Sequence, residues 1–336
     1  MNDNQIELGF GPMSSESIEA VYRYSNYNRR RLMLIASKNQ IDHSGGYVNN
    51  WTTDQYAAYI SKMKELYPQA EVLVCRDHCG PGFNGNDDLS DVYKTIDADI
   101  KNNFNLIHID FCHIKGDKDH QLSESKKVIE YCKKLNPKIK LEVGTDENLG
   151  INYSINNLDE IEKEVDYFTE FCQPDFFVVQ TGTLIKEVNQ VGNFNQEFIT
   201  DASKILQNRN IKLKEHNADY LSEDEINKRI GIVGAMNIAP QLGVVQTMTV
   251  LNKCLIYGID FTDYANEVYN GKKWSKWLNT NTPENKFLCI AIAGHYHFAS
   301  STYQRLIEQL NKQEDIVETI INNLTEIINH YAKTRE

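Results

Sequence analysis

The feature that most constrains the fold of this chain is a regular alternation of short apolar segments with longer amphipathic ones. Near-continuous apolar strands are typical of a parallel sheet that is buried on both faces. Eight strand–helix units in succession predict an α/β protein with a closed (β/α)8 TIM barrel rather than an open sheet. The predicted strands are Ile6–Phe10, Leu32–Ala36, Glu71–Cys75, Leu106–Phe111, Lys138–Val143, Phe176–Gln180, Ile211–Lys214 and Gly231–Ile238.

The segments between these strands have the pattern of amphipathic helices. Ser222, followed by Glu225, forms a capping-box pattern at the start of one of them. A helix over Gln241–Tyr257 is predicted to complete the eighth unit, so the barrel takes residues 1–260. Residues 261–336 are predicted to form a mostly helical extension that packs on the barrel. The other predicted helices span residues 15–28, 53–66, 88–102, 121–134, 157–172, 196–208 and 222–229.

Composition limits the partners that this chain is expected to have. Its 336 residues accommodate one barrel of about 250 residues with extensions. A formal net charge of -12 argues against nucleic acid or an anionic membrane as the main partner. We see no apolar run near the roughly 18 residues that span a bilayer and no signal-peptide pattern. Seven scattered cysteines are read as reduced thiols. These features together predict a cytoplasmic protein.

Polar side chains follow or end seven of the eight predicted strands. The C-terminal ends of the strands of a parallel barrel meet at one face, and catalytic groups gather there. The residues in question are Asn39 and Gln40, Asp77 and His78, Asp110, Glu142, Gln180 and Thr183, His216 and Asp219, and Asn237.

Two histidines at these strand ends predict a metal site. By strand count, His78 and His216 lie on opposite sides of the barrel, where both point toward its axis if their registers agree. Two imidazoles and a carboxylate form a site for a divalent metal such as zinc. We favour Glu142 as the carboxylate ligand, with Asp146 and Glu147 as alternatives. An ion with an open coordination position polarises a carbonyl or stabilises an enediolate.

The remaining strand-end residues are assigned to proton transfer and to substrate. Asp77 is the predicted catalytic acid/base, although the same Asp-His pair also fits a turn cap and a backbone hydrogen bond. His108 is interpreted as structural. A competing pair, His295 and His297, is interpreted as packing or as an edge that contacts substrate, because no third ligand is evident nearby. The predicted substrate-binding residues are Asn39, Gln40, Asp110, Gln180, Thr183, Asp219 and Asn237.

A series of short motifs follows the order of the predicted strands. They are Ala36-Ser37-Lys38-Asn39-Gln40 with Gly45-Gly46-Tyr47, Asp77-His78-Cys79-Gly80-Pro81, Ile107-His108-Ile109-Asp110, Val143-Gly144-Thr145, Val178-Val179-Gln180 and Glu215-His216-Asn217-Ala218-Asp219-Tyr220. Taken in order, these motifs resemble the GatZ/KbaZ family, the non-catalytic subunits of class II D-tagatose-1,6-bisphosphate aldolase, within the class II aldolase superfamily. The resemblance covers approximately residues 6–300.

The catalytic members of this superfamily imply roles for individual residues of this chain. The resemblance implies that Asp77 is the catalytic acid/base, that His78 and His216 bind zinc with Glu142 nearby, and that Asn237 contacts substrate. This chain departs from the catalytic pattern in two places. Gln180-Thr181-Gly182-Thr183 stands where a further zinc-binding histidine is expected, and Asn217-Ala218-Asp219 replaces a Gly-Gly-Ser phosphate loop.

Two hypotheses about function follow. The first is a metal-dependent enzyme that performs aldol cleavage or condensation, or epimerises a carbinol carbon, on a ketose or ketose phosphate. The second is a non-catalytic partner that stabilises a separate tagatose-bisphosphate aldolase subunit. The expected partners are therefore a sugar or sugar phosphate, with a second copy of the chain or an aldolase catalytic subunit as further candidates. We find no nucleotide-binding motif that fits a kinase.

Overall fold

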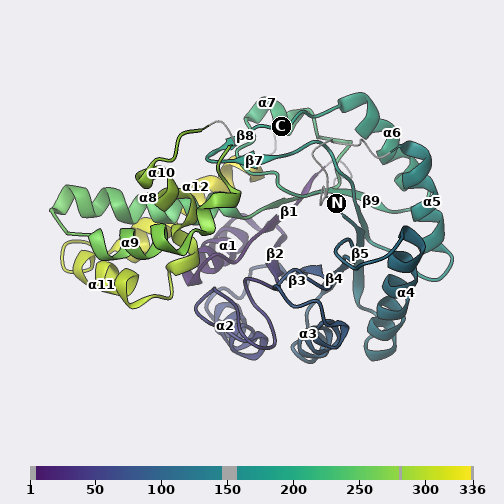
Figure 1. The fold of residues 1–336 in the computed structure, drawn as a ribbon, viewed down its shortest axis with the longest axis horizontal. Helices are drawn as coiled ribbons and strands as arrows, with labels where there is room; N and C mark the ends of the chain where they lie inside the picture. The colour runs from purple at the N-terminus through teal and green to yellow at the C-terminus, as the bar shows by residue number, and fades with distance from the viewer. Residues whose placement is uncertain (1–4, 146–156, 280–281, 334–336) are drawn as a thin grey trace.

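Eight parallel strands close into a barrel in a computed structural model that describes residues 5–145, 157–279 and 282–333. The order around the barrel is β1-β10-β9-β6-β5-β4-β3-β2, which confirms the predicted (β/α)8 fold (Figure 1). The two alternative carboxylate ligands, Asp146 and Glu147, lie outside the described residues. The barrel strands are β1 (Glu7–Phe10), β2 (Leu32–Ser37), β3 (Val72–Cys79), β4 (Leu106–Ile109), β5 (Lys140–Gly144), β6 (Phe176–Val178), β9 (Lys212–Glu215) and β10 (Ala235–Ile238).

Helices surround the barrel, as the amphipathic pattern predicted. Capping boxes start three of them, at Ser14, Thr52 and the predicted Ser222. Apolar side chains on the outer faces of the strands pack against these helices, and a smaller apolar cluster fills the barrel interior. The helices between and after the strands are α1 (Ser15–Asn28), α2 (Thr53–Leu66), α3 (Leu89–Lys101), α4 (Lys118–Leu135), α5 (Leu158–Thr169), α6 (Gln196–Gln207), α7 (Glu223–Asn227) and α8 (Pro240–Tyr257).

The last strand differs from its prediction. The apolar run from Gly231 predicts eight strand residues, but β10 begins only at Ala235. The N–H groups of Ile232 and Val233 donate to the Arg229 carbonyl at 3.0 and 2.9 Å, so the preceding residues form a turn. A short hairpin that was not predicted, β7 (Ile185–Lys186) with β8 (Asn189–Gln190), follows β6.

The C-terminal residues form helices on one side of the barrel (Figure 1). The last of them packs against α1 and α8, where Arg23 binds Glu318 at 2.7 Å. No helix in the described part of the chain is long and apolar enough to cross a bilayer. The boundary at residue 260 stays a prediction. These elements are α9 (Thr262–Gly271), η1 (Lys273–Lys276), α10 (Lys286–Ala293), η2 (Gly294–His297), α11 (Ser301–Leu310) and α12 (Ile316–Ala332).

A buried ion pair ties β3 to α3. The guanidinium of Arg76 donates to Asp99 at 2.7 and 2.6 Å and to the Ala36 carbonyl at 3.0 Å, and both charged side chains are fully buried. Because Arg76→Met leaves Asp99 buried without its partner, we expect it to lower the free energy of unfolding by about 3–5 kcal/mol in urea titrations. The control is Lys101→Met, which removes an exposed pair with Asp54 and is expected to cost about 1 kcal/mol or less. Equal effects of the two variants would contradict this prediction.

Candidate active site

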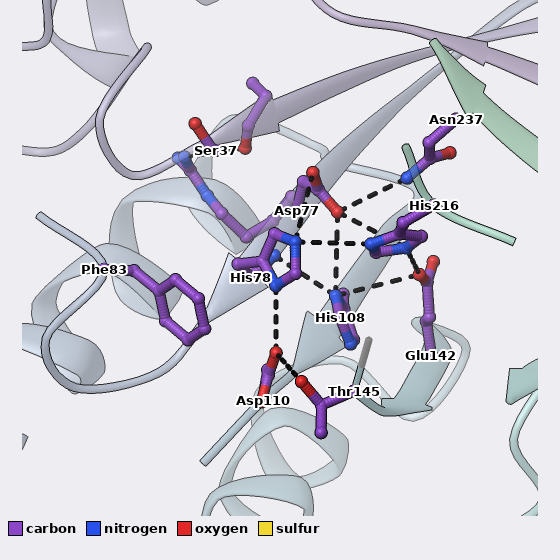
Figure 2. Close-up of polar contacts among 12 residues, drawn as sticks. Ser37, Asp77, His78, Phe83, His108, Asp110, Glu142, Thr145, His216 and Asn237 are labelled. Atoms are coloured by element: carbon purple, nitrogen blue, oxygen red, sulfur yellow. Dashed lines mark hydrogen bonds and ion pairs between the residues drawn. The ribbon is translucent and has the colours of Figure 1, made fainter. Parts of the chain in front are cut away.

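The end of β3 holds two of the predicted site residues in an irregular stretch of backbone. The pairing of β3 with β4 shifts register between Arg76 and Cys79, and His78 has a φ of 45°. A left-handed φ at a residue that is not glycine stores strain, which is often found at functional sites. Gly80 lies against β4 so closely that a Cβ there would be 1.5 Å from the Asp110 carbonyl oxygen. This backbone turns His78 toward the other strand ends (Figure 2).

The ring of His78 is oriented by a carboxylate from the end of β4. Its Nδ1 lies 2.9 Å from Asp110 Oδ2, which also accepts a hydrogen bond from the Thr145 hydroxyl at 3.0 Å. Burial raises the pKa of Asp110, but the hydrogen bond and charge of His78 outweigh burial and hold this pKa well below its usual value. The Phe83 ring stacks on the His78 imidazole, with 4.8 Å between the two ring centroids. With Nδ1 turned to Asp110, the other ring nitrogen of His78, Nε2, faces the barrel axis.

A second carboxylate orients His216, which follows β9. Its Nε2 lies 2.8 Å from Glu142 Oε1, and the other oxygen of Glu142 lies 2.5 Å from Lys214 Nζ. Burial raises the pKa of Glu142, but the charge of Lys214 outweighs burial and lowers this pKa to about 2. Glu142 is therefore an ionised acceptor. Nδ1 of His216 faces His78 Nε2 at 3.2 Å, and the direction of this hydrogen bond depends on the tautomers of the two rings.

A third imidazole, His108 on β4, completes the cluster. It is fully buried, and its Nε2 donates to the Gly144 carbonyl at 2.9 Å. Its Nδ1 is therefore the acceptor nitrogen. It accepts a hydrogen bond from the His78 backbone N–H at 3.2 Å and lies 3.6 Å from Asp77 Oδ1. The pairing of His108 with Glu142 in the β4–β5 register brings this ring beneath the two strand-end histidines.

Four potential ligand residues thus meet on the barrel axis (Figure 2). One ligand atom from each of Asp77, His78, His108 and His216 lies within 4.8 Å of the others. Burial raises the pKa of Asp77, but the surrounding imidazoles outweigh burial and hold it far below its usual value. The predicted substrate residue Asn237 lies beside this carboxylate, with Nδ2 at 3.4 Å from Asp77 Oδ1.

The donor set fits a divalent metal ion. Imidazole nitrogens and a carboxylate are the ligands of catalytic zinc sites, and ligating histidines commonly donate their outer N–H to a carboxylate or carbonyl. In charge, the carboxylates of Asp77, Asp110 and Glu142 exceed the single ammonium of Lys214 by two negative charges when the imidazoles are neutral. A divalent cation balances that excess.

Several other predicted substrate residues have structural partners. Gln40 is buried and accepts the Ser37 N–H at 2.9 Å. Asn39 is exposed and donates to the Phe83 carbonyl. Thr183 donates to the His216 carbonyl at 2.9 Å. Gln180 lies half-buried after β6. Their assignment to substrate binding stays a prediction.

Asp219 is also set apart from the metal cluster. It is fully buried, and its Oδ1 accepts the N–H groups of Ala239 and Gln241 at the start of α8. Burial raises the pKa of Asp219 to about 7. The competing pair, His295 and His297, lies in the short helix η2. Residues two apart share a face on a strand but not on a helix, so these two side chains do not point the same way.

A second polar cluster lies between the loop after β2 and α3. Asp42, His43 and Asp91 have ligand atoms within 4.8 Å of one another, but Lys38 Nζ binds Asp91 at 2.6 Å. Asn84 donates to both carboxylates at 2.9 Å. A buried lysine already supplies positive charge there, so this cluster is a structural tie.

Comparisons with known proteins support the fold. No known family model matches the chain. A protein described as a probable tagatose 6 phosphate kinase from Sinorhizobium meliloti 1021 is 13% identical over 98% of this chain and 99% of its own, with a TM-score of 0.78. The YdjI aldolase from Escherichia coli K12 is 15% identical over 92% and 91%, with a TM-score of 0.55. The fructose-bisphosphate aldolase from Campylobacter jejuni is 13% identical over 95% and 91%, with a TM-score of 0.59. At these identities the likeness shows a shared (β/α)8 barrel fold.

Proposed function

We propose that this chain is a metal-dependent enzyme of the class II aldolase type that acts on a ketose or ketose phosphate. The observation that carries the proposal is the convergence of three imidazoles and the Asp77 carboxylate on the barrel axis, with one nitrogen of each ring held by a carboxylate or carbonyl oxygen. The aldolase-type barrels with the same fold support the reaction class.

The ligands that we propose differ in one place from the sequence-based set. His78, His108 and His216 hold the metal, with zinc as the first candidate. Glu142 is assigned to orient His216, because its two oxygens already contact His216 and Lys214. A divalent ion bound there supplies positive charge that polarises a substrate carbonyl.

Asp77 is the proposed proton-transfer residue. The imidazoles around Asp77 keep its carboxylate ionised, which is the form that can accept a proton. In the proposed step it accepts the proton of a substrate hydroxyl two carbons from the carbonyl. The bond between the carbon that bears this hydroxyl and the carbon next to the carbonyl then breaks. Its electron pair moves toward the carbonyl, which leaves an aldehyde and an enolate. If the bond re-forms on the opposite face of the aldehyde, the product is an epimer. Asn237 orients the Asp77 carboxylate.

The experiment that tests the proposal is an assay of the purified chain alone. The chain loaded with zinc, manganese or cobalt is incubated with ketohexoses and their mono- and bisphosphates, and cleavage and epimerisation are followed by NMR. We expect turnover that a chelator abolishes. If activity requires a separate aldolase subunit that co-purifies with the chain, the proposal fails and the non-catalytic partner function stands. The absence of a histidine after β6, where Thr181 instead donates to Glu215, is the observation that favours that alternative.

A further inference from the structure

We propose that the substrate of this site is a ketose with one end lying over β9, β10 and β1, and that this end carries no phosphate. Ketose bisphosphates are therefore not its substrates. The inference rests on the proposed function, because it specifies the substrate of the same site. In TIM barrels a phosphate is frequently held by the loops after the seventh and eighth strands and by a helix N-terminus. Here those strands are β9 and β10, and α8 is the helix that follows.

The N-terminus of α8 has its first backbone donors already engaged. The N–H groups of Ala239 and Gln241 donate to Asp219 Oδ1 at 3.1 and 2.8 Å. Pro240 has no N–H, and the N–H of Leu242 donates to the Ala239 carbonyl at 3.1 Å. These four positions are the ones that normally bind an anion at a helix start. Asp219 therefore occupies, with its own carboxylate, the place of a ligand phosphate.

The space around this helix start is closed as well. Gly11, at the end of β1, lies so close to α8 that a Cβ there would be 2.5 Å from the Ala239 Cβ. The Gln241 side-chain oxygen accepts the Tyr220 N–H at 2.9 Å and lies 3.0 Å from the Tyr331 hydroxyl of α12. The side-chain oxygen of Gln241 is thus also engaged within the protein.

Charge acts in the same direction. The segments that follow β1, β9 and β10 contain no lysine or arginine over residues 11–17, 216–222 and 239–247. A phosphate monoester carries about two negative charges at neutral pH and needs cationic or N–H partners. In this sector it would meet the capped Asp219 carboxyl group and no lysine or arginine from these three segments. An end that bears hydroxyl groups carries no charge and needs no cationic partner.

The first test uses inorganic phosphate as the probe on metal-free protein, with the backbone amide NMR signals of Ala239 and Gln241 as the readout. We expect no phosphate-dependent shift in the unaltered protein or in Asp219→Asn, whose side-chain oxygen keeps the cap. We expect a shift in Asp219→Ala, which frees both N–H groups. Shifts in the unaltered protein would overturn the inference, as would a folded Asp219→Ala variant whose signals do not move.

The second test needs no variant and decides the inference even if Asp219→Ala does not fold. Binding of a ketohexose and of its 1,6-bisphosphate to the metal-loaded protein is measured by calorimetry. We expect the bisphosphate to bind at least about tenfold more weakly, a difference of 1.4 kcal/mol or more. Tighter binding of the bisphosphate would overturn this inference and leave the proposed function standing. Failure of every sugar to bind would instead overturn the proposed function, and this inference with it.

Discussion

The double variant His78→Ala, His216→Ala is expected to lose the divalent ion that the unaltered protein retains after purification. Two of the three proposed ligands are removed. Substituting a residue that only hydrogen-bonds to a metal ligand weakens metal binding about 10–100-fold. The loss of two ligands is therefore expected to weaken metal binding by more than about 10,000-fold. The measurement is metal content by elemental analysis, followed by competition with a chelator of known affinity. Zinc, manganese and cobalt are each added back to test for rescue.

Single variants distinguish the two proposed ligand sets. His108→Asn is expected to weaken metal binding as strongly as loss of a ligand, whereas Glu142→Gln is expected to weaken it by only about 10–100-fold. His120→Ala, an exposed histidine at the start of α4, is the matched control and is expected to keep full occupancy. The opposite ranking, with metal lost in Glu142→Gln and kept in His108→Asn, would restore Glu142 as the ligand. An unaltered protein that never binds metal would remove the proposed mechanism.

The barrel was predictable because the signals for it are local in the sequence. Buried parallel strands need a continuous apolar run, and amphipathic helices repeat their apolar residues every three to four positions, so both are visible without tertiary information. The prediction was wrong at Gly231–Gly234, where apolar residues form a turn. The pattern of hydrophobicity there is the same as in a strand, and only the hydrogen bonds to Arg229 distinguish the two.

The candidate site was predictable only as a set of strand ends. His78 and His216 were identified because each follows a strand, but His108 sits inside β4, where a buried histidine is most often structural. Its place in the cluster depends on the register that pairs it with Glu142 and on the Gly144 carbonyl. Lys214 looks like an ordinary charged residue near a strand end until the barrel closes and brings its ammonium to Glu142.

The cap formed by Asp219 shows the same limit. In the sequence it is one more acid after a strand, and such acids point to substrate as readily as to structure. Its two backbone donors come from Ala239 and Gln241, on the far side of β10. Contacts between neighbouring units of the barrel decide its role, and no local pattern encodes them.

Asp77→Asn is expected to lower kcat for cleavage or epimerisation by about 100- to 10,000-fold while the protein keeps its metal. Asparagine has nearly the same shape as aspartate but cannot accept a proton at neutral pH. The three imidazoles and the oxygens that orient them are untouched, so metal content and the dissociation constant of the ketose should change little. The control, Asp201→Asn, removes an exposed charge paired with Lys204 and is expected to leave kcat unchanged.

The metal measurement is what separates the two roles open to Asp77, which lies within reach of all three imidazoles. Loss of kcat with full metal content assigns it to proton transfer. Loss of metal to the extent seen in the double histidine variant would make Asp77 a fourth ligand, and the base would then have to come from another residue. Unchanged turnover in Asp77→Asn would contradict both roles, because a residue that moves the proton or holds the ion cannot be replaced by an amide without cost.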